Sequence, residues 1–384
     1  MTEIRTIQPN DLPQVMDLVE KVDFPHRSEA GWHWALFENP QQGDIPPGFV
    51  SEVDGKVVSI VGMQARDFCC DGERLKAATG HTFISDKNAR GTGAPLAHRA
   101  ITWPGIASLY TLNNNARSAG LYKKLGMGAW LSEAGRSRTE WPVRPLAMAA
   151  GLGFSRLARA DRFYDALSSR EWFNGRSASL RQIAVDLLAD EDRLDPDNAT
   201  DAALIDSFNA SICRAKSVAP VRTAAFYAYQ MADPDAPGRS ALLTARDGNR
   251  ILGLMQVFLT KPNAFEPAEL EITDLEVHPD APRSRTIGHL VRNARKIARA
   301  AGAGRLRLLL SGRFSREDLS QTGYHFQRRY SYDPAHASFG DGMEHFSEGW
   351  TPTGFEGDFH FALRVAPDPK ARRGAATKGP ASTD

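Results

Sequence analysis

The amino-acid sequence predicts an α+β fold made of two tandem domains, each a mixed, mostly antiparallel sheet flanked by helices. Its 384 residues are long for one ordinary domain and suit two. Short apolar runs bounded by turn signals alternate with helical patterns, and the order of these segments in the first half returns in the second. We expect a first domain at 1–135, a helical connector at 136–195, a second domain at 196–366 and a disordered tail at 367–384.

Four landmarks of the first half recur at a nearly constant spacing of roughly 195 residues, which indicates a duplicated domain. Each half has an aromatic segment that ends in an amide or acid and a proline, then an Asp-Gly turn, a glycine that opens a helix, and a glycine–apolar pair. The pairs are Trp32–Pro40 with Phe226–Pro234, Asp54-Gly55 with Asp247-Gly248, Gly93 with Gly288, and Gly126-Met127 with Gly323-Tyr324.

Each segment of the first half has its own signal. Asp11 is placed to cap a helix, with Gln14 reaching back to it, and Asp54-Gly55 makes a hairpin turn. One strand runs into a glycine-rich turn and a helix, which is a unit suited to phosphate. The expected strands are 4–7, 49–53, 57–64, 68–70, 75–85 and 107–112, and the expected helices begin near Asp11, Gly93 and Ala116.

Composition excludes several classes of protein. The net charge of +1 gives no bulk attraction to nucleic acid. No run approaches the roughly 18 uncharged apolar residues of a membrane span, and the first residues carry charges where a signal peptide would be apolar. Cys69, Cys70 and Cys213 are odd in number and lack metal-ligand spacing, so we expect reduced structural thiols, no metal site and a cytoplasmic location.

The strand that ends near Ser85 is followed by a loop with two glycines and then a helix. Gly91 and Gly93 allow backbone N–H groups to point at an anion without interference from a Cβ atom, and the helix N-terminus adds partial positive charge. Arg90 adds a full positive charge. Such a loop is suited to a pyrophosphate, although a glycine-rich strand–helix turn without a ligand has the same pattern.

A second segment decides between these interpretations. Asn88–Gly93 fits the Gln/Arg-x-x-Gly-x-Gly/Ala loop of the GNAT acetyltransferases apart from Asn88, and Asn115–Met127 follows at the distance expected for their Asn-x-x-Ala-x-x-Leu-Tyr-x-Lys-x-Gly-Phe signature. Ser118 and Met127 depart slightly from that signature. The first half, from about residue 4 to 135, therefore resembles the GNAT superfamily.

The resemblance implies acetyl-CoA or a longer acyl-CoA as co-substrate, with no permanently bound cofactor. The glycine loop would hold the pyrophosphate, the strand ending at Ile84 would pair with the pantetheine arm, and an N–H near Phe83 would stabilise the carbonyl oxygen. Tyr122 would protonate the departing thiolate, or it is simply a helix residue packed on the sheet. The residues expected to bind acyl-CoA are Phe83, Ile84, Arg90, Gly91, Thr92, Gly93, Ala94 and Asn115.

The general base and the acceptor pocket have weaker signals. His81 lies on the strand that leads to the loop, and a histidine near neutral pKa suits deprotonation of an amine. A hydrogen-bonded strand histidine fits equally well. Trp32 and Trp34 precede the hairpin, where GNAT enzymes usually build the acceptor pocket, although aromatic residues there are more often core.

The second copy departs from the pattern, because Pro282 removes a backbone donor from the loop and Leu319 stands where the tyrosine would be. We expect it to bind CoA weakly or not at all. Its acidic strand, including Glu271, faces either an amine-binding cleft or solvent. The arginine-rich, apolar connector segment 143–164 is either an interdomain helix or a helix that lies on an anionic membrane.

These observations predict an N-acyltransferase that acylates a primary amine, such as a long-chain, sphingoid-like lipid amine. An amino sugar or cell-envelope precursor is the alternative acceptor. A non-catalytic acyl-CoA sensor is the competing class. The expected partners are acyl-CoA and the amine, without nucleic acid, and with possible peripheral contact to the inner membrane face.

Overall fold

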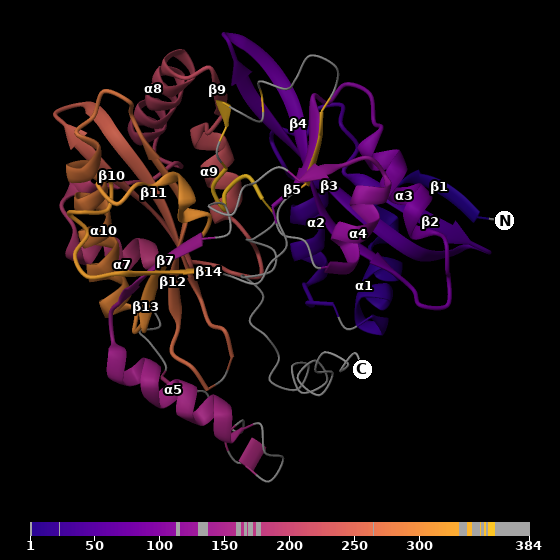
Figure 1. Cartoon of the computed structure of the whole chain (residues 1–384), viewed down its shortest axis with the longest axis horizontal. Coiled ribbons are helices and arrows are strands. Elements are labelled where there is room, and N and C mark those ends of the chain that lie inside the picture. The colour runs from indigo at the N-terminus through magenta and orange to yellow at the C-terminus, as the bar shows by residue number, and fades with distance from the viewer. Residues whose placement is uncertain are drawn as a thin grey trace.

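The computed structural model describes the chain except for short gaps and the C-terminal stretch. Two sheets lie side by side, the first in indigo and purple and the second in orange, with helices beside each (Figure 1). The expected tail 367–384 lies outside the described residues. Those residues are 2–22, 24–112, 116–129, 137–158, 163–164, 167, 172–173, 178–263, 265–329, 336–339, 346, 349–350 and 352–357.

The first sheet has the strand order β1-β2-β3-β4-β5-β15-β6, and β9 pairs with the far end of β3. All neighbours are antiparallel except β4 and β5, which run parallel. The strands are β1 (Thr2–Thr6), β2 (Gly48–Val53), β3 (Lys56–Cys70), β4 (Glu73–Ser85), β5 (Ser108–Thr111), β6 (Gly128–Ala129), β9 (Val218–Pro220) and β15 (His336–Phe339).

The second sheet has the order β8-β10-β11-β12-β13-β7-β14, which matches the first sheet position by position. Its one parallel pair, β12 with β13, occupies the place of β4 with β5. The prediction of two duplicated α+β domains is therefore confirmed. The strands are β7 (Ser137–Pro142), β8 (Arg193–Leu194), β10 (Ser240–Asp247), β11 (Arg250–Thr260), β12 (Glu269–Val277), β13 (Arg305–Leu308) and β14 (Phe326–Arg329).

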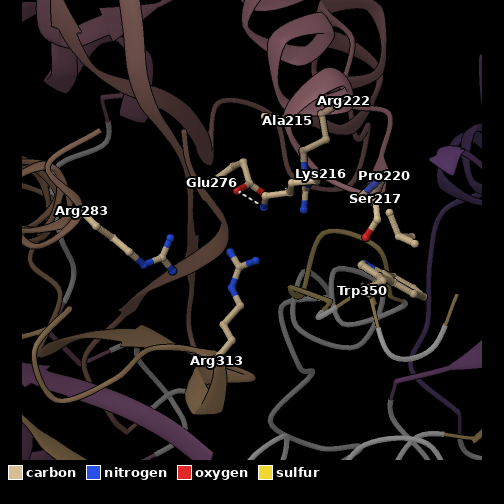
Figure 2. Close-up of a pocket in the computed structure, with 11 residues that line it drawn as sticks. Ala215, Lys216, Ser217, Pro220, Arg222, Glu276, Arg283, Arg313 and Trp350 are labelled. Carbon is tan, nitrogen blue, oxygen red and sulfur yellow. Dashed lines mark hydrogen bonds and ion pairs between the residues drawn. The ribbon is translucent and has the colours of Figure 1, made fainter. Parts of the chain in front are cut away.

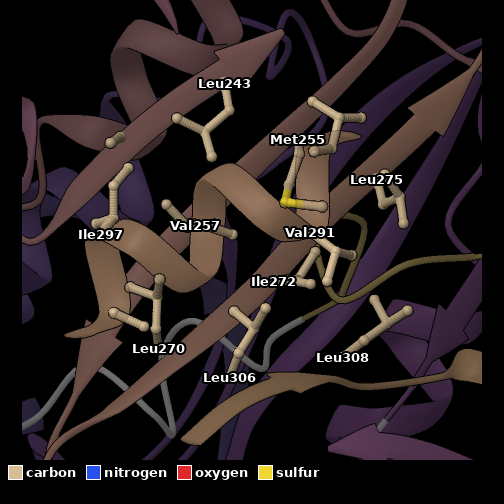
Figure 3. Close-up of a cluster of buried hydrophobic side chains, with 14 of the residues drawn as sticks. Leu243, Met255, Val257, Leu270, Ile272, Leu275, Val291, Ile297, Leu306 and Leu308 are labelled. Atoms are coloured by element: carbon tan, nitrogen blue, oxygen red, sulfur yellow. The ribbon is translucent and has the colours of Figure 1, made fainter. Parts of the chain in front are cut away.

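Helices bury their apolar faces on both sheets. In the second copy, α10 lays a continuous apolar face on the sheet, with Val291 and Ile297 packed among residues of β11 and β12 (Figure 3). The helices are α1 (Leu12–Lys21), α2 (Glu29–Phe37), α3 (Gly93–Ile101), α4 (Ala116–Lys124), α5 (Pro145–Leu157), α7 (Leu180–Leu187), α8 (Ala199–Ala215), α9 (Ala224–Met231) and α10 (Arg283–Ala300), with short 3-10 turns η1 (Pro9–Asp11), η3 (Asp190–Asp192) and η4 (Ser311–Arg313).

The two copies exchange a strand. β15, from the second half, lies between β5 and β6 of the first sheet, and β7, from the first half, lies between β13 and β14 of the second. The stretch 136–195 was expected to be helical, and α5 and α7 do lie in it, but β7 is a strand. The physical reason is burial, since Thr139 and Trp141 are fully enclosed in the second sheet and its core.

The junction between the copies is a packed core. Trp34 of α2 stacks on Tyr229 of α9 at a centroid distance of 4.7 Å, and its indole N–H donates to the Tyr229 carbonyl at 2.9 Å. Arg27 pairs with Asp233 at 2.6 Å with both side chains buried. The Tyr110 hydroxyl, on β5, donates to the carbonyl of Glu356 at 2.9 Å. Each copy therefore buries side chains of the other and contributes to its stability.

Candidate acyl-donor site

The first sheet opens between β4 and β5. The two strands pair only at Ala78–Leu109 and Thr79–Tyr110, whereas β4 runs on to Ser85. Over this stretch the described part of β5 offers no partner to the β4 edge. Backbone amides along an unpaired edge can bind an extended, amide-containing ligand as a further strand would.

A bulge lies within the same stretch of β4. The register with β3 shifts between Ile60 and Gly62, and Thr82 takes a left-handed conformation with φ of 51°. A bulge turns backbone groups out of the ladder. The backbone N–H groups next to Phe83 are therefore candidates for binding the carbonyl oxygen of a ligand.

The loop after β4 leads into the N-terminus of α3. Gly91 has φ of 88°, which favours glycine, and Arg90 is exposed beside it. Thr92 turns inward, where its Oγ1 lies 2.6 Å from Ser59 Oγ and donates to the Ala89 carbonyl at 2.8 Å. Because Thr92 does not cap the helix with its side chain, the first-turn N–H groups are left for an anion.

Gly93 is required for a different reason. A Cβ atom there would lie 2.9 Å from Ser85 Oγ and 3.2 Å from the Phe83 ring, so glycine allows α3 to approach β4 closely. Asp86 holds the start of the loop, since its carboxylate accepts from the Asn88 N–H at 2.9 Å and pairs with Lys21. The Asn88 N–H bond, followed by the Lys21 bond, lowers the pKa of Asp86.

Tyr122 lies on the same side of the opening. Its ring, on α4, faces the Phe83 ring with a centroid distance of 6.0 Å, and it packs with Ala97 of α3 and with Met127. Phe83 thus contacts both the helix that carries the glycine loop and the helix that carries Tyr122. The structure brings together Phe83, Thr92, Gly93 and Tyr122, with Arg90, Gly91 and Ala94 beside them, whereas the side chain of Ile84 packs in a separate cluster with α1 and α2. Asn115 lies outside the described residues.

His81 has the surroundings of a structural residue. Its ring is buried over Gly62, where a Cβ atom would lie 2.2 Å from the ring, and its Nδ1 lies 2.9 Å from Thr82 Oγ1. Burial, followed by the positive charges of Arg66 and Arg27, lowers the pKa of His81 to about 3. A group this reluctant to take a proton is a poor general base, so the geometry favours the hydrogen-bonded strand histidine.

The two tryptophans predicted to bind the acceptor lie in cores. Trp32 is 1% exposed and packs with α1 and β2, and Trp34 is 1% exposed in the junction between the copies. Neither indole presents a surface to a ligand in this structure. Both residues were selected because they belong to an aromatic cluster before a hairpin. A buried helix has this sequence pattern as readily as a ligand pocket does.

Glu271 is also enclosed. It is fully buried on β12, and Arg307 of β13 donates to its carboxylate. The neighbouring Glu269 pairs in the same way with Arg305, and Glu140 of β7 pairs with Arg305 at 3.1 Å. At Glu269 and Glu271 the strand therefore borders neither an open cleft nor solvent, because both carboxylates are buried and paired with arginines of β13.

The second copy contains a cavity that no sequence motif predicted. It has a volume of about 450 Å³ and lies where β12 ends and α10 begins (Figure 2). Single arginines and lysines scattered along a sequence form no motif, so only folding reveals that they gather here. Its charged and aromatic lining residues are Lys216, Arg222, Glu276, Arg283, Arg313 and Trp350.

Among the described residues, no group of three or more histidine, cysteine or acidic side chains could hold a metal ion. No helix within the described part has the length and apolar character needed to cross a membrane.

No protein-family model matches the chain, and no curated protein matches it. Several solved structures are similar to it in fold. A probable N-acyltransferase from Enterococcus faecalis V583 has a TM-score of 0.51 at 10% identity, over 88% of this chain and 73% of the other. A GCN5-related N-acetyltransferase from Anabaena variabilis ATCC 29413 gives the same four values. N-myristoyltransferase of Saccharomyces cerevisiae gives 0.49 at 11% identity, over 87% and 81%.

At these identities the similarity establishes the fold. The chain has the fold of the GCN5-related N-acyltransferases, present in two copies that share one strand order. The predicted superfamily fold is therefore confirmed.

Proposed function

We propose that the chain transfers an acyl group from acyl-CoA to a primary amine, with the acyl-CoA held by the first copy. The observation that carries the proposal is the convergence of three features at one place: the open edge of β4, the uncapped N-terminus of α3 behind Gly91, and Tyr122 packed against Phe83. Each suits one part of an acyl-CoA, namely the pantetheine amides, the pyrophosphate and the thiol leaving group.

The reaction follows from this arrangement. The neutral amine attacks the thioester carbonyl carbon, a C–N bond forms, and the N–H groups at the β4 bulge stabilise the oxyanion. The C–S bond then breaks, and the thiolate takes a proton from the Tyr122 hydroxyl, which is restored by the proton that the attacking nitrogen releases. His81 takes no part in these steps, because burial lowers its pKa and makes it a weak base.

The acceptor, we propose, is an amine with an apolar portion that enters between the copies. Support comes from α5, which docks through Gly151 on Pro267 and leaves Leu146, Leu152 and Leu157 exposed to 86%, 46% and 51%. The sequence of α5 has no acidic residue. An exposed apolar helix face without acids suits the surface of an anionic bilayer, where a lipid amine would be found.

The test measures release of free CoA thiol from acyl-CoA in the presence of candidate amines, with calorimetry of CoA binding. We expect thiol release that depends on amine, and one CoA site per chain. Gly91→Glu should abolish binding, because it places a side chain and a negative charge where the pyrophosphate lies.

The outcomes separate the alternatives. CoA binding without amine-dependent thiol release would identify a sensor and reject the enzyme. Two equal CoA sites, or normal binding by Gly91→Glu, would reject the first copy as the donor site. Faster reaction of polar amino sugars than of long-chain amines would replace the lipid acceptor by a sugar or envelope precursor.

A further inference from the structure

The second copy opens in the same place as the first. β12 pairs with β13 only from Glu269–Ile272 to Arg305–Leu308, and then continues to Val277 without it. The cavity of about 450 Å³ lies at this opening, next to the N-terminus of α10. It thus occupies the position in the second copy that the proposed acyl-CoA site occupies in the first.

Cationic side chains have replaced the backbone cradle at this position. Arg283 is the first residue of α10 and Arg313 the last of η4, and both guanidinium groups point into the cavity (Figure 2). Lys216 and Arg222 approach from the segment around β9. Four cationic side chains therefore line the cavity together with one carboxylate, that of Glu276.

Acidic side chains near the cavity form ion pairs with some of these cations. Glu276 accepts from Lys216 at 2.7 Å and lies 3.3 Å from Arg222, which also pairs with Glu356 at 2.5 Å. Arg222 also pairs with Asp274 at 2.9 Å, Arg283 pairs with Asp318 at 2.8 Å, and Arg313 donates to the Leu275 carbonyl. Of the charged side chains that line the cavity itself, four are cationic and one is acidic, and the acidic one, Glu276, is already engaged and so is not offered to an ammonium group.

The pKa values of the buried side chains around the cavity reflect this crowding of charges. Burial lowers the pKa of Lys216 and that of Arg313; the carboxylate of Glu276 opposes this in both cases, and a neighbouring arginine adds to it. Burial also raises the pKa of Glu356. The buried positive charges thus disfavour one another, and an anion in the cavity would stabilise them.

CoA itself does not fit the loop here. Pro282 lacks an N–H donor, and Asp280 places a carboxylate near the helix N-terminus. Apolar side chains of Val218, Pro220 and Trp350 line the cavity beside the cations, and the Trp350 ring is held in place by edge-on packing with Phe68 and Tyr110 at 4.7 and 4.9 Å. A cavity of this size holds a small molecule, and its two walls suit an anionic head with an apolar body.

We infer that the cavity of the second copy binds a small organic anion, whose phosphate or carboxylate head is held by Arg283 and Arg313 and whose apolar body lies against Trp350. The inference concerns a site separate from the acyl-CoA site of the first copy, and it holds whether or not the chain is an acyltransferase. Guanidinium groups suit both heads because they form paired, charge-assisted hydrogen bonds to either.

The test titrates the full chain with phenyl phosphate, benzoate and benzylamine, which share a ring and differ in the charged head. We expect one site per chain for at least one of the two anions, and their relative affinities identify the head. Arg283→Ala and Arg313→Ala should each weaken binding by roughly tenfold or more. Arg285→Ala is the matched control, because Arg285 is an exposed arginine of the same helix turn outside the cavity.

Three results would overturn the inference. They are benzylamine binding as well as the anions, no binding of either anion, or unchanged affinity in Arg283→Ala. Arg283 is 39% exposed and so its variant should fold even if Arg313→Ala does not. Loss of anion binding in Gly91→Glu, rather than in Arg283→Ala, would place the anion in the first copy and leave the proposed function standing.

Discussion

Tyr122 is the residue whose role the proposed reaction tests most directly. Tyr122→Phe removes the proton donor and keeps the ring that packs on Phe83. We expect turnover to fall by roughly ten- to ten-thousand-fold, the range for general acid catalysis, with CoA affinity nearly unchanged. Steady-state kinetics over a range of pH, with calorimetry of CoA, measures both quantities.

The matched control for this variant is Tyr324→Phe. Tyr324 is 76% exposed in the second copy, so the same chemical change there should leave the rate unaltered. An unchanged rate in Tyr122→Phe at every pH would remove its hydroxyl from the mechanism and leave it as a packing residue.

His81 makes a prediction about stability. An unfolded histidine takes a proton below about pH 6.5, whereas folded His81 resists until about pH 3. Unfolding therefore takes up a proton between these values, so this group's contribution is fully present above pH 6.5 and is lost as pH falls, by about 1.4 kcal/mol per pH unit. His81→Gln should flatten the dependence of the free energy of unfolding on pH, measured with denaturant from pH 7 to pH 4.

The exposed His98 of α3 supplies the control. His98→Gln should leave the slope unchanged. A slope in His81→Gln as steep as that of the natural chain would show that His81 becomes protonated in the fold.

A site residue can be predicted from the sequence when its place depends on neighbouring residues, and not when it depends on residues far away in the chain. The glycine loop and Tyr122 were singled out from fixed local spacing, and the structure places both beside Phe83, while their roles stay predictions. Trp34 and Glu271 were assigned by residue type, and their surroundings come from Tyr229 and Arg307, distant in sequence. Residue type alone does not say what will pack against a side chain.

At the scale of elements, the two parallel strand pairs show that two copies of one fold can share an opening in the sheet and differ in the residues around it. Both sheets open at the same place, so the opening belongs to the fold. What differs is the loop and the segment that follows β5 or β13. α4 carries Tyr122 in the first copy, whereas the described residues 309–325 hold η4, with Arg313, in the second. A shared strand order therefore places a site without fixing what it binds.

The helix α5 carries the prediction about membranes. Leu146→Ser with Leu157→Ser removes two exposed apolar side chains from the face that does not dock on the protein. Each buried leucine contributes roughly 1.5–3 kcal/mol, so we expect binding to vesicles of phosphatidylglycerol and phosphatidylcholine to weaken by tenfold or more. Sedimentation with the vesicles measures this.

The control for α5 is Val185→Ser, which removes a 47%-exposed apolar side chain from α7. It should bind vesicles as the natural chain does. If the natural chain fails to sediment with these vesicles, the membrane contact and the support it lends to a lipid acceptor are both rejected.

At the scale of the whole molecule, the duplication was predictable and the strand exchange was not. The landmarks that repeat lie in hairpins, turns and helix starts, which local patterns report. β7 and β15 are short strands that occupy the equivalent position in the two sheets, each in the sheet of the other half. Pairing between segments so far apart in sequence leaves no local pattern. The residues after the predicted boundary at 135 therefore contain every strand of the second sheet and also β9 and β15 of the first.

The exchange makes the two copies one folding unit. Residues 1–135 alone lack β15, which lies between β5 and β6, and also β9 and the Tyr229 ring on which Trp34 stacks. We expect this fragment to be unfolded or aggregated when expressed alone, and to fold as a complex when it is co-expressed with residues 136–384, because the second fragment supplies β9 and β15 to the first sheet. Circular dichroism and co-purification measure this, and the whole chain should unfold in a single transition. A monomeric 1–135 fragment that melts cooperatively and binds CoA would show that the first copy is an independent domain to which β15 adds little.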